Sequence, residues 1–422
     1  MSSIKPLTSS RKTGGRLIES RDLAQEYLAK ELNRRSLLAG ALAAASAAAC
    51  SDGSNNTPAP PRDSGTPPAD VPLADVPPAR QTHLVGVGQH DDHLMAAERA
   101  LAETAGFDFV QRGQRVYLKV NTNSGDPFPY STSPDMIRWV VSKLRDRGAE
   151  VFIGDRSFWG DRNTMANFRR NGIADVAQEL GVDLQVFGDT RQGDAASVSV
   201  DWMDLPMDDT MLGARSAFWD GEMRVPVMVA QADHIINMAC VKTHFIATFT
   251  MSMKNIIGII NPADRARPNN LGGHAGNVGG RLYRQVAFMN KALPTSSLVV
   301  LDGWEALITG GPTTSLMERP SGAPANFMPL TTSPRVVIIS RDRLAADLTG
   351  VGLLRLLSPS YEPVVRDRTI WGNRQISVAI NAGVGITTPE QYDVGGSLQI
   401  TGARDMMNYD LAALRELVTR QA

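Results

Sequence analysis

The sequence is poor in cysteine, in aromatic residues and in net charge. Its 422 residues include only two cysteines, Cys50 and Cys240, and aromatic residues make up 6%. Two thiols are too few for a cluster held by four cysteine thiolates, so we expect no iron–sulfur cluster. The formal net charge of -1 provides no basic field for nucleic acid. No run approaches the roughly 20 consecutive apolar residues that span a bilayer.

A twin-arginine signature lies near the N-terminus, at Asn33-Arg34-Arg35-Ser36-Leu37-Leu38. The alanine-rich run that follows is short and only mildly apolar, which favours twin-arginine export over a strongly apolar signal. The run ends in Ala47-Ala48-Ala49-Cys50, which resembles a lipoprotein cleavage site. We expect lipidation of Cys50. The alternative is a plain signal cleavage near Ala49.

These features predict an exported protein at the periplasmic or outer face of the cell envelope. Its expected partners there are the twin-arginine translocase during export and the membrane, through the lipid anchor alone. Residues 51–80 hold eight of the 25 prolines and no aromatic residue. Such a segment buries too little surface to fold, so it is expected to be a disordered tether. The predicted divisions are a signal peptide (1–50), a tether (51–80) and one large domain (81–422).

From Thr82 onward, short runs rich in β-branched residues alternate with helical patterns. The best helix is Pro134 to Arg147, where Ser133 is a natural N-cap and Pro134 suits the first helical position. Further helices are expected at Thr164 to Leu180 and at Arg343 to Leu354. This alternation predicts an α/β fold with a mostly parallel or mixed sheet flanked by helices. The strand candidates are His83–Val87, Arg115–Val120, Glu150–Ile153, Asp183–Phe187, His234–Met238, Leu298–Leu301, Arg335–Ile339 and Ile376–Ile380.

Polar residues at strand ends are the first candidates for a site, because open α/β sheets bind ligands beyond the carboxyl ends of their strands. Asp155 and Asp302 each follow such a strand beside a glycine. Either carboxylate can bind a ligand or metal, orient a histidine or act as a base, and either can equally be a turn or capping residue. The other strand-end candidates are Lys119, Asn121 and Lys242-Thr243-His244.

A second polar block follows the strand that ends in Lys242-Thr243-His244. Thr250, Lys254 and Asn255 lie within it, in a stretch rich in Thr, Met and Ser that makes a poor surface helix. Two lysines and a histidine that converge on a cavity favour an anionic ligand such as a phosphate or carboxylate. A surface loop with solvated lysines is the alternative.

These residues resemble the family catalogued as domain of unknown function 362. The resemblance is most specific from Lys242-Thr243-His244 to Lys254-Asn255 with Gly258, and it covers roughly residues 85–354. It implies an α/β fold and little about activity. Some relatives have ferredoxin-type cysteine motifs that imply redox work, and this chain lacks them. Met251 lies where a glycine is common in the family.

A possible metal site involves two histidines. His274 lies between glycines in Leu271-Gly272-Gly273-His274-Ala275-Gly276 and is a candidate partner for His244. Two imidazoles can supply metal ligands or an acid–base pair, so a divalent metal is an open alternative, and the cofactor stays unknown. His90 and His93 lie three apart, but Asp91 or Asp92 is expected to cap a helix that begins near His93.

Two functions fit this pattern. The first is an enzyme that acts on a small anionic molecule, with His244, Lys242, Lys254 and Asp155 as its catalytic residues. Its ligand-binding residues would be Lys119, Asn121, Thr243, Thr250, Asn255 and Asp302. The second is a non-catalytic anion-binding or accessory protein of the cell envelope. A GxSxG elbow and an HExxH motif are absent, so the sequence favours neither a serine hydrolase nor a zincin.

Overall fold

The computed structural model describes residues 82–157, 163–188, 200–205, 218–244, 247–265, 267, 270, 281–293, 297–314, 329–358, 367–401 and 407–420. All of them belong to one compact unit, Pro77–Ala422. The export signal, the tether, Cys50 and His274 lie outside the described residues. No helix among those residues is both long and apolar enough to cross a membrane.

Ten strands of the described chain form one mixed sheet, with β8 paired to β7, β10 paired to β9, and the rest in the order β12-β1-β11-β9-β7-β2-β3-β4. Strands β9, β7, β2, β3 and β4 run parallel, whereas β11 is antiparallel to β9 and β1. The strands are β1 (Val85–Gln89), β2 (Arg115–Lys119), β3 (Glu150–Asp155), β4 (Asp183–Val186), β7 (His234–His244), β8 (Thr248–Phe249), β9 (Leu298–Thr309), β10 (Leu330–Thr332), β11 (Val336–Ser340) and β12 (Val394–Gly396).

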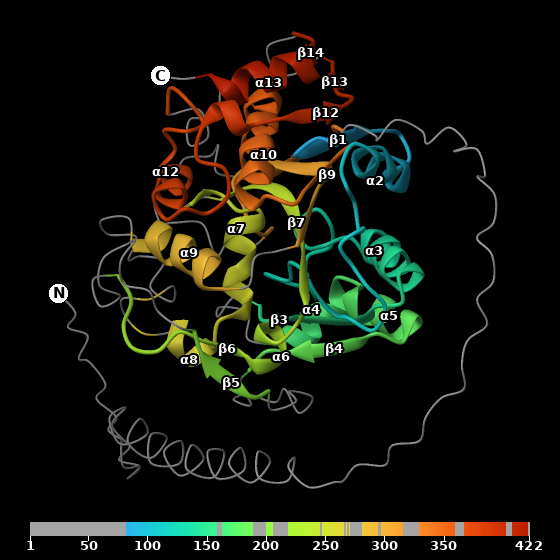
Figure 1. Cartoon of the computed structure of the whole chain (residues 1–422), viewed down its shortest axis with the longest axis vertical. Helices are drawn as coiled ribbons and strands as arrows, with labels where there is room; N and C mark the ends of the chain where they lie inside the picture. Colours follow the sequence, from blue (N-terminus) through green and yellow to red (C-terminus); the bar gives the residue numbers. More distant parts are fainter. Residues whose placement is uncertain are drawn as a thin grey trace, which may run out of the picture. The chain divides into compact units, whose positions relative to one another are not determined.

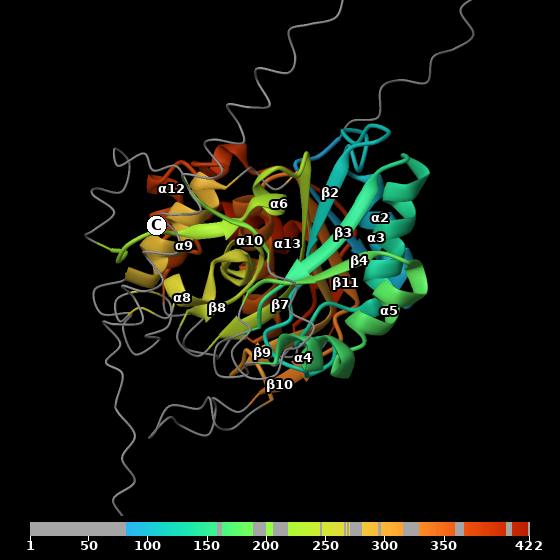
Figure 2. The same cartoon turned by 90° about the horizontal axis from the view of Figure 1, so that it is seen from below.

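Helices cover both faces of this sheet (Figures 1 and 2). One face packs against α2 (His93–Ala102), α3 (Pro134–Asp146), α4 (Thr164–Arg170) and α5 (Ile173–Leu180). The other packs against α7 (Ser252–Asn255), α9 (Arg281–Ala292), α10 (Arg343–Leu357), α12 (Arg374–Asn381) and α13 (Leu411–Thr419). Side chains of β7 alternate between the two cores, as the pleat of a strand requires: Ile236 faces the first and Ile235 the second.

Shorter elements complete the described chain. Two small antiparallel sheets consist of β5 (Trp202–Asp204) with β6 (Arg224–Pro226), and of β13 (Gln399–Ile400) with β14 (Tyr409–Asp410). The remaining helical turns are α6 (Val227–Ala230), η2 (Ile256–Ile259), α8 (Pro262–Arg265) and η7 (Pro389–Gln391).

The predicted α/β fold is confirmed, and the expected helices at Pro134 and Arg343 begin where the sequence placed them. Ser133 caps α3 by accepting from the Met136 N–H. The C-terminal segment belongs to the same sheet, because β12 pairs in parallel with β1.

Two local predictions were wrong. The strand expected at Ile376–Ile380 is helix α12, in which Asn373 caps the first turn and Ile376 and Ala379 are buried at helical spacing. Packing of that face outweighs the preference of β-branched residues for strands. The single helix expected from Thr164 to Leu180 is two helices, since the chain turns at Gly172, whose φ is 82°.

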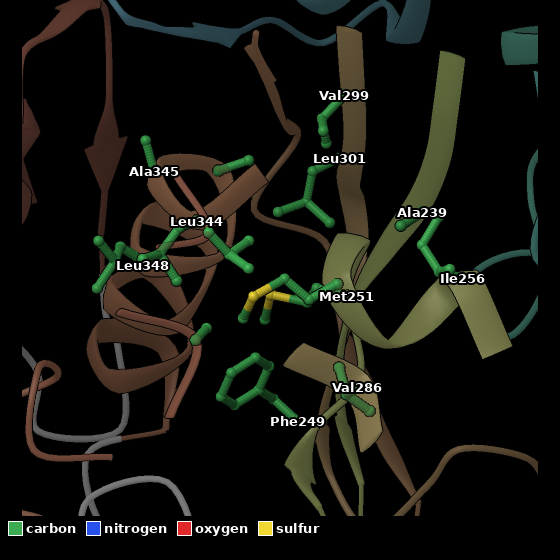
Figure 3. Close-up of a cluster of buried hydrophobic side chains, with 14 of the residues drawn as sticks. Ala239, Phe249, Met251, Ile256, Val286, Val299, Leu301, Leu344, Ala345 and Leu348 are labelled. Carbon is green, nitrogen blue, oxygen red and sulfur yellow. The ribbon is translucent and has the colours of Figure 1, made fainter. Parts of the chain in front are cut away.

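The segment that leads into α7 is fixed in the second core. Figure 3 shows Met251 and Phe249 beside α10, whose Leu344 and Leu348 belong to the same buried cluster. A Cβ at Gly350 would lie 2.5 Å from the Met251 sulfur and 2.8 Å from Leu301 Cδ2, so a larger residue there must displace these buried side chains. Met251 therefore packs closely against α10 one residue before α7 begins.

Candidate functional site

A pocket opens at the carboxyl ends of β2, β3 and β7, where open α/β sheets bind ligands. Its cavity volume is about 50 Å³. The lining residues come from three strand ends, α7, η2, α8 and the loop after β9. They are Lys119, Asn121, Asn123, Asp155, Arg156, Lys242, Thr250, Lys254, Asn255, Ile257, Gly258, Arg265 and Pro312.

Positive charge dominates this pocket. Among the described residues that line it, five are basic and only Asp155 is acidic. Every one of these six side chains is at least nine-tenths buried. Buried charges are costly unless opposite charge and hydrogen bonds accompany them, so the lining favours an anion.

The ion pair of Lys119 and Asp155 forms the floor of the pocket. Lys119 Nζ lies 2.8 Å from Asp155 Oδ1 and also donates to the Val120 carbonyl and to Asn255 Oδ1. Three acceptors satisfy the three donors of a lysine ammonium. Asp155 accepts in addition from the Thr122 and Arg156 N–H groups, at 2.9 and 2.8 Å. Burial lowers the pKa of Lys119, and the charge of Asp155 opposes this shift only in part.

Gly258 lets η2 approach this ion pair. A Cβ there would lie 1.8 Å from Asp155 Oδ1 and 3.0 Å from Lys119 Nζ. Any larger residue must displace the pair, so glycine is required by contact at this position.

Helix α7 brings Lys254 and Asn255 to the pocket, and Asp347 of α10 holds this helix. The Asp347 carboxylate accepts from the Ser252 and Met253 N–H groups at 2.8 and 3.1 Å, and from Ser252 Oγ at 2.6 Å. It thereby satisfies the first backbone donors of α7. Burial raises the pKa of Asp347 to about 7.

The loop between β2 and α3 closes another side. Lys242 Nζ and Asn121 Nδ2 both donate to the Tyr130 carbonyl, at 2.6 and 2.8 Å. Cys240 lies behind Asn121, where its thiol donates to the Ser131 carbonyl at 3.4 Å. Burial raises the pKa of this thiol to about 12, so Cys240 is held as a neutral packing residue.

Sequence reasoning missed two arginines. Arg156 directly follows Asp155 and donates to the Gly188 carbonyl at 3.0 Å, while Arg265 of α8 donates to the Ser157 carbonyl at 2.8 Å. Burial and the nearby charge of Arg156 lower the pKa of Arg265 to about 9. Arg156 was detectable as a neighbour of a strand-end aspartate. No sequence pattern around Arg265 indicated a pocket residue, because only the fold brings α8 to the strand ends that form the pocket.

Seven of the predicted residues line this pocket: Lys119, Asn121, Asp155, Lys242, Thr250, Lys254 and Asn255. Thr243, His244 and Asp302 do not line it. Thr243 Oγ1 donates to the Leu307 and Gly310 carbonyls at 3.3 and 3.0 Å and so holds the loop that contains Pro312. His244 is buried at the β7–β8 turn, where its Nδ1 accepts from the Ala247 N–H at 3.3 Å.

Asp302 instead binds His93, which the sequence analysis considered together with His90 and placed at the start of a helix. His93 Nε2 lies 3.0 and 2.9 Å from the two carboxylate oxygens, and its ring stacks on Phe128 and Trp304. Burial lowers the pKa of His93, but the hydrogen bond and charge of Asp302 outweigh it, so the pKa is raised. Phe128 belongs to the β2–α3 loop, so this cluster also braces that loop. The predicted cap is confirmed, since Asp92 accepts from the Met95 N–H.

Among the described residues, no three His, Cys, Asp or Glu side chains lie close enough together to hold a metal ion. The predicted pairing of His244 with His274 stays a prediction, since the structure does not describe His274.

The fold and the pocket define an α/β protein with a cation-lined site at its strand ends. The family model described as "Domain of unknown function (DUF362)" matches residues 116–352, more than half of the chain. The chain therefore belongs to this family, as the resemblance in the Lys-Thr-His to Lys-Asn block implied. Every lining residue lies within the matched range.

Known proteins similar to this chain include a thylakoid-associated protein and a lactate racemase apoprotein. Thylakoid-associated protein sll1697 of Synechocystis sp. is 27% identical over 223 residues, which are 52% of this chain and 61% of that protein. The match thus spans less than two thirds of the relative. The lactate racemase apoprotein from Thermoanaerobacterium thermosaccharolyticum has a TM-score of 0.32 and 14% identity, over 54% of this chain and 52% of that one. That likeness is too low to support an inference about this protein.

Proposed function

We propose that the protein is an enzyme that binds a small anionic molecule in this pocket and moves a proton on it. The supporting observation is the lining itself: five buried basic side chains and one carboxylate at the carboxyl ends of parallel strands. The basic groups bind and orient the anion, and they stabilise negative charge that develops on it. The pair of Lys119 and Asp155 is the group placed to exchange the proton, because it is the titratable pair on the pocket floor.

A non-catalytic anion receptor is the second candidate. It is favoured by the Lys119 ammonium, whose three donors already have acceptors, and by the place of His244 outside the lining. A divalent metal held by His244 and His274 is an additional proposal, which elemental analysis of the purified full-length protein tests.

An exchange experiment in deuterated water distinguishes the enzyme from the receptor. Small anions found to bind by calorimetry are incubated with the protein, and loss of their C–H signals is followed by proton NMR. An enzyme of the proposed kind exchanges a C–H proton of at least one bound anion, and Asp155→Asn abolishes exchange while the anion still binds. Binding without exchange of any C–H in the wild type identifies a receptor. Lys291→Met, on the exposed face of α9, is the matched control.

We also propose export by the twin-arginine route and anchoring through Cys50, supported by the residues from Asn33 to Cys50. Replacing Arg34 and Arg35 with lysine should retain the protein in the cytoplasm. Cys50→Ser should release exported protein from the membrane fraction and remove acyl labelling. A Cys50→Ser protein that still sediments with membranes contradicts the anchor.

A further inference from the structure

We infer that the pocket selects a phosphate-type dianion, a tetrahedral group with at least three acceptor oxygens, over a carboxylate. This inference rests on the proposed anion pocket and names the class of its ligand. The shared chemistry is that of inorganic phosphate and of the phosphoryl group of a monoester.

The first support is the direction from which the charges come. Apart from Lys119, four basic side chains reach the pocket from four separate segments: Arg156 after β3, Lys242 on β7, Lys254 on α7 and Arg265 on α8. A carboxylate offers two oxygens in one plane, which suits one guanidinium or two neighbouring donors. A tetrahedral oxyanion directs oxygens to several sides at once, which suits donors from four segments.

The second support is the amount of charge. Lys119 and Asp155 lie 2.8 Å apart and offset each other. The other four basic groups of the lining are all buried. A carboxylate brings one negative charge into this site, whereas a phosphate monoester brings nearly two at neutral pH. Among the described lining residues the basic groups outnumber the acidic one, and a dianion matches such a lining better than a monoanion does.

The third support is the pair of arginines. Both guanidinium groups line the same pocket, and burial, followed by the nearby charge of Arg156, lowers the pKa of Arg265. Arg265 is 4% exposed, and its Nε has no hydrogen-bond acceptor among the described residues. An oxyanion beside both guanidinium groups supplies acceptor oxygens and removes the repulsion.

The cavity size limits what enters. About 50 Å³ holds one compact polar group and not a whole metabolite. The phosphate-type group therefore sits among the basic side chains, and the rest of a monoester lies in the opening.

Calorimetry on the full-length protein tests this inference with four ions at constant ionic strength: methyl phosphate, inorganic phosphate, sulfate and acetate. At about pH 8 we expect the three tetrahedral ions to bind at least about tenfold more tightly than acetate. Acetate that binds equally well overturns the inference but leaves an anion pocket. No binding by any ion overturns the anion pocket as well. Tighter binding of the ester than of free phosphate identifies monoesters as the source, and the reverse identifies free phosphate.

The charge state of the ligand gives a second readout. The second pKa of a phosphate monoester is about 6, so at about pH 5 methyl phosphate is mostly a monoanion and its affinity should fall about tenfold. Sulfate stays a dianion and corrects for changes in the protein itself. An equal fall for both ions contradicts selection of the dianion.

Arg265→Met should weaken methyl phosphate binding by about tenfold or more, with Lys291→Met as the control. A folded Arg265→Met protein with unchanged affinity overturns the assignment of Arg265. The comparison of ions on the wild type decides the inference independently if this variant does not fold.

Discussion

Two buried aspartates on the same sheet differ sharply in what surrounds them. Asp155 ends β3 and Asp302 lies within β9, and in the sequence each follows apolar strand residues beside a glycine. Asp155 pairs with a lysine, accepts two backbone N–H groups and lines a pocket. Asp302 pairs with a histidine between two aromatic rings and lines no part of that pocket. The same residue in the same local context thus lines the candidate pocket in one place and packs against a histidine in the other.

The largest test of this comparison is removal of each carboxylate. Asp155→Ala leaves the Lys119 charge buried without its partner, so we expect a loss of about 3–5 kcal/mol in the free energy of unfolding. Asp302→Ala removes the hydrogen bonds of this carboxylate with the His93 imidazole and with the main-chain N–H of Trp304. The expected loss in the free energy of unfolding is about 1–3 kcal/mol. Urea unfolding of both variants gives the two values. Equal losses would contradict the distinction between the two sites.

Gly258→Ala disturbs only the surroundings of Asp155. The added methyl group must displace Asp155 or Lys119, so we expect a loss of about 1–3 kcal/mol together with weaker anion binding. Gly372→Ala is the matched control, since a Cβ there meets nothing closer than 3.3 Å. Unfolding and calorimetry measure the two effects. Wild-type anion affinity in the Gly258→Ala protein would show that the Lys119–Asp155 ion pair takes no part in binding the anion.

The smallest expected effect is the pH dependence of the stability that the Asp302–His93 pair contributes. The folded state raises the pKa of His93, so this site contributes stability that is fully present below about pH 6.5 and lost as the pH rises through the raised value. Burial opposes this shift of the His93 pKa, and the groups that raise the pKa are Asp302 on β9, Asp135 on α3 and Asp92 at the helix cap. Unfolding between about pH 6 and pH 8 should show a decline that His93→Gln removes and that His90→Gln leaves in place. If the stability of the His93→Gln protein still declines over this pH range, another titratable group causes the decline.

Much of the fold was open to sequence reasoning, because strand runs and helix caps act over a few neighbouring residues. The strand from Glu150 and the Ser133 cap of α3 are examples. Ile376 was misassigned for the opposite reason: its burial against distant residues, rather than its own preference, made that segment helical.

The candidate site divides in the same way. The sequence by itself determined the membership of the family and the polar residues at the ends of β2, β3 and β7, since a strand that gives way to Lys, Asn or Asp marks the ligand edge of a parallel sheet. Only the tertiary structure decided that Lys119 faces Asp155, that Arg265 joins them, and that Asp302 belongs with His93. Those pairings join residues more than 30 positions apart in the chain, and the order in which the strands assemble sets them, which no local pattern records.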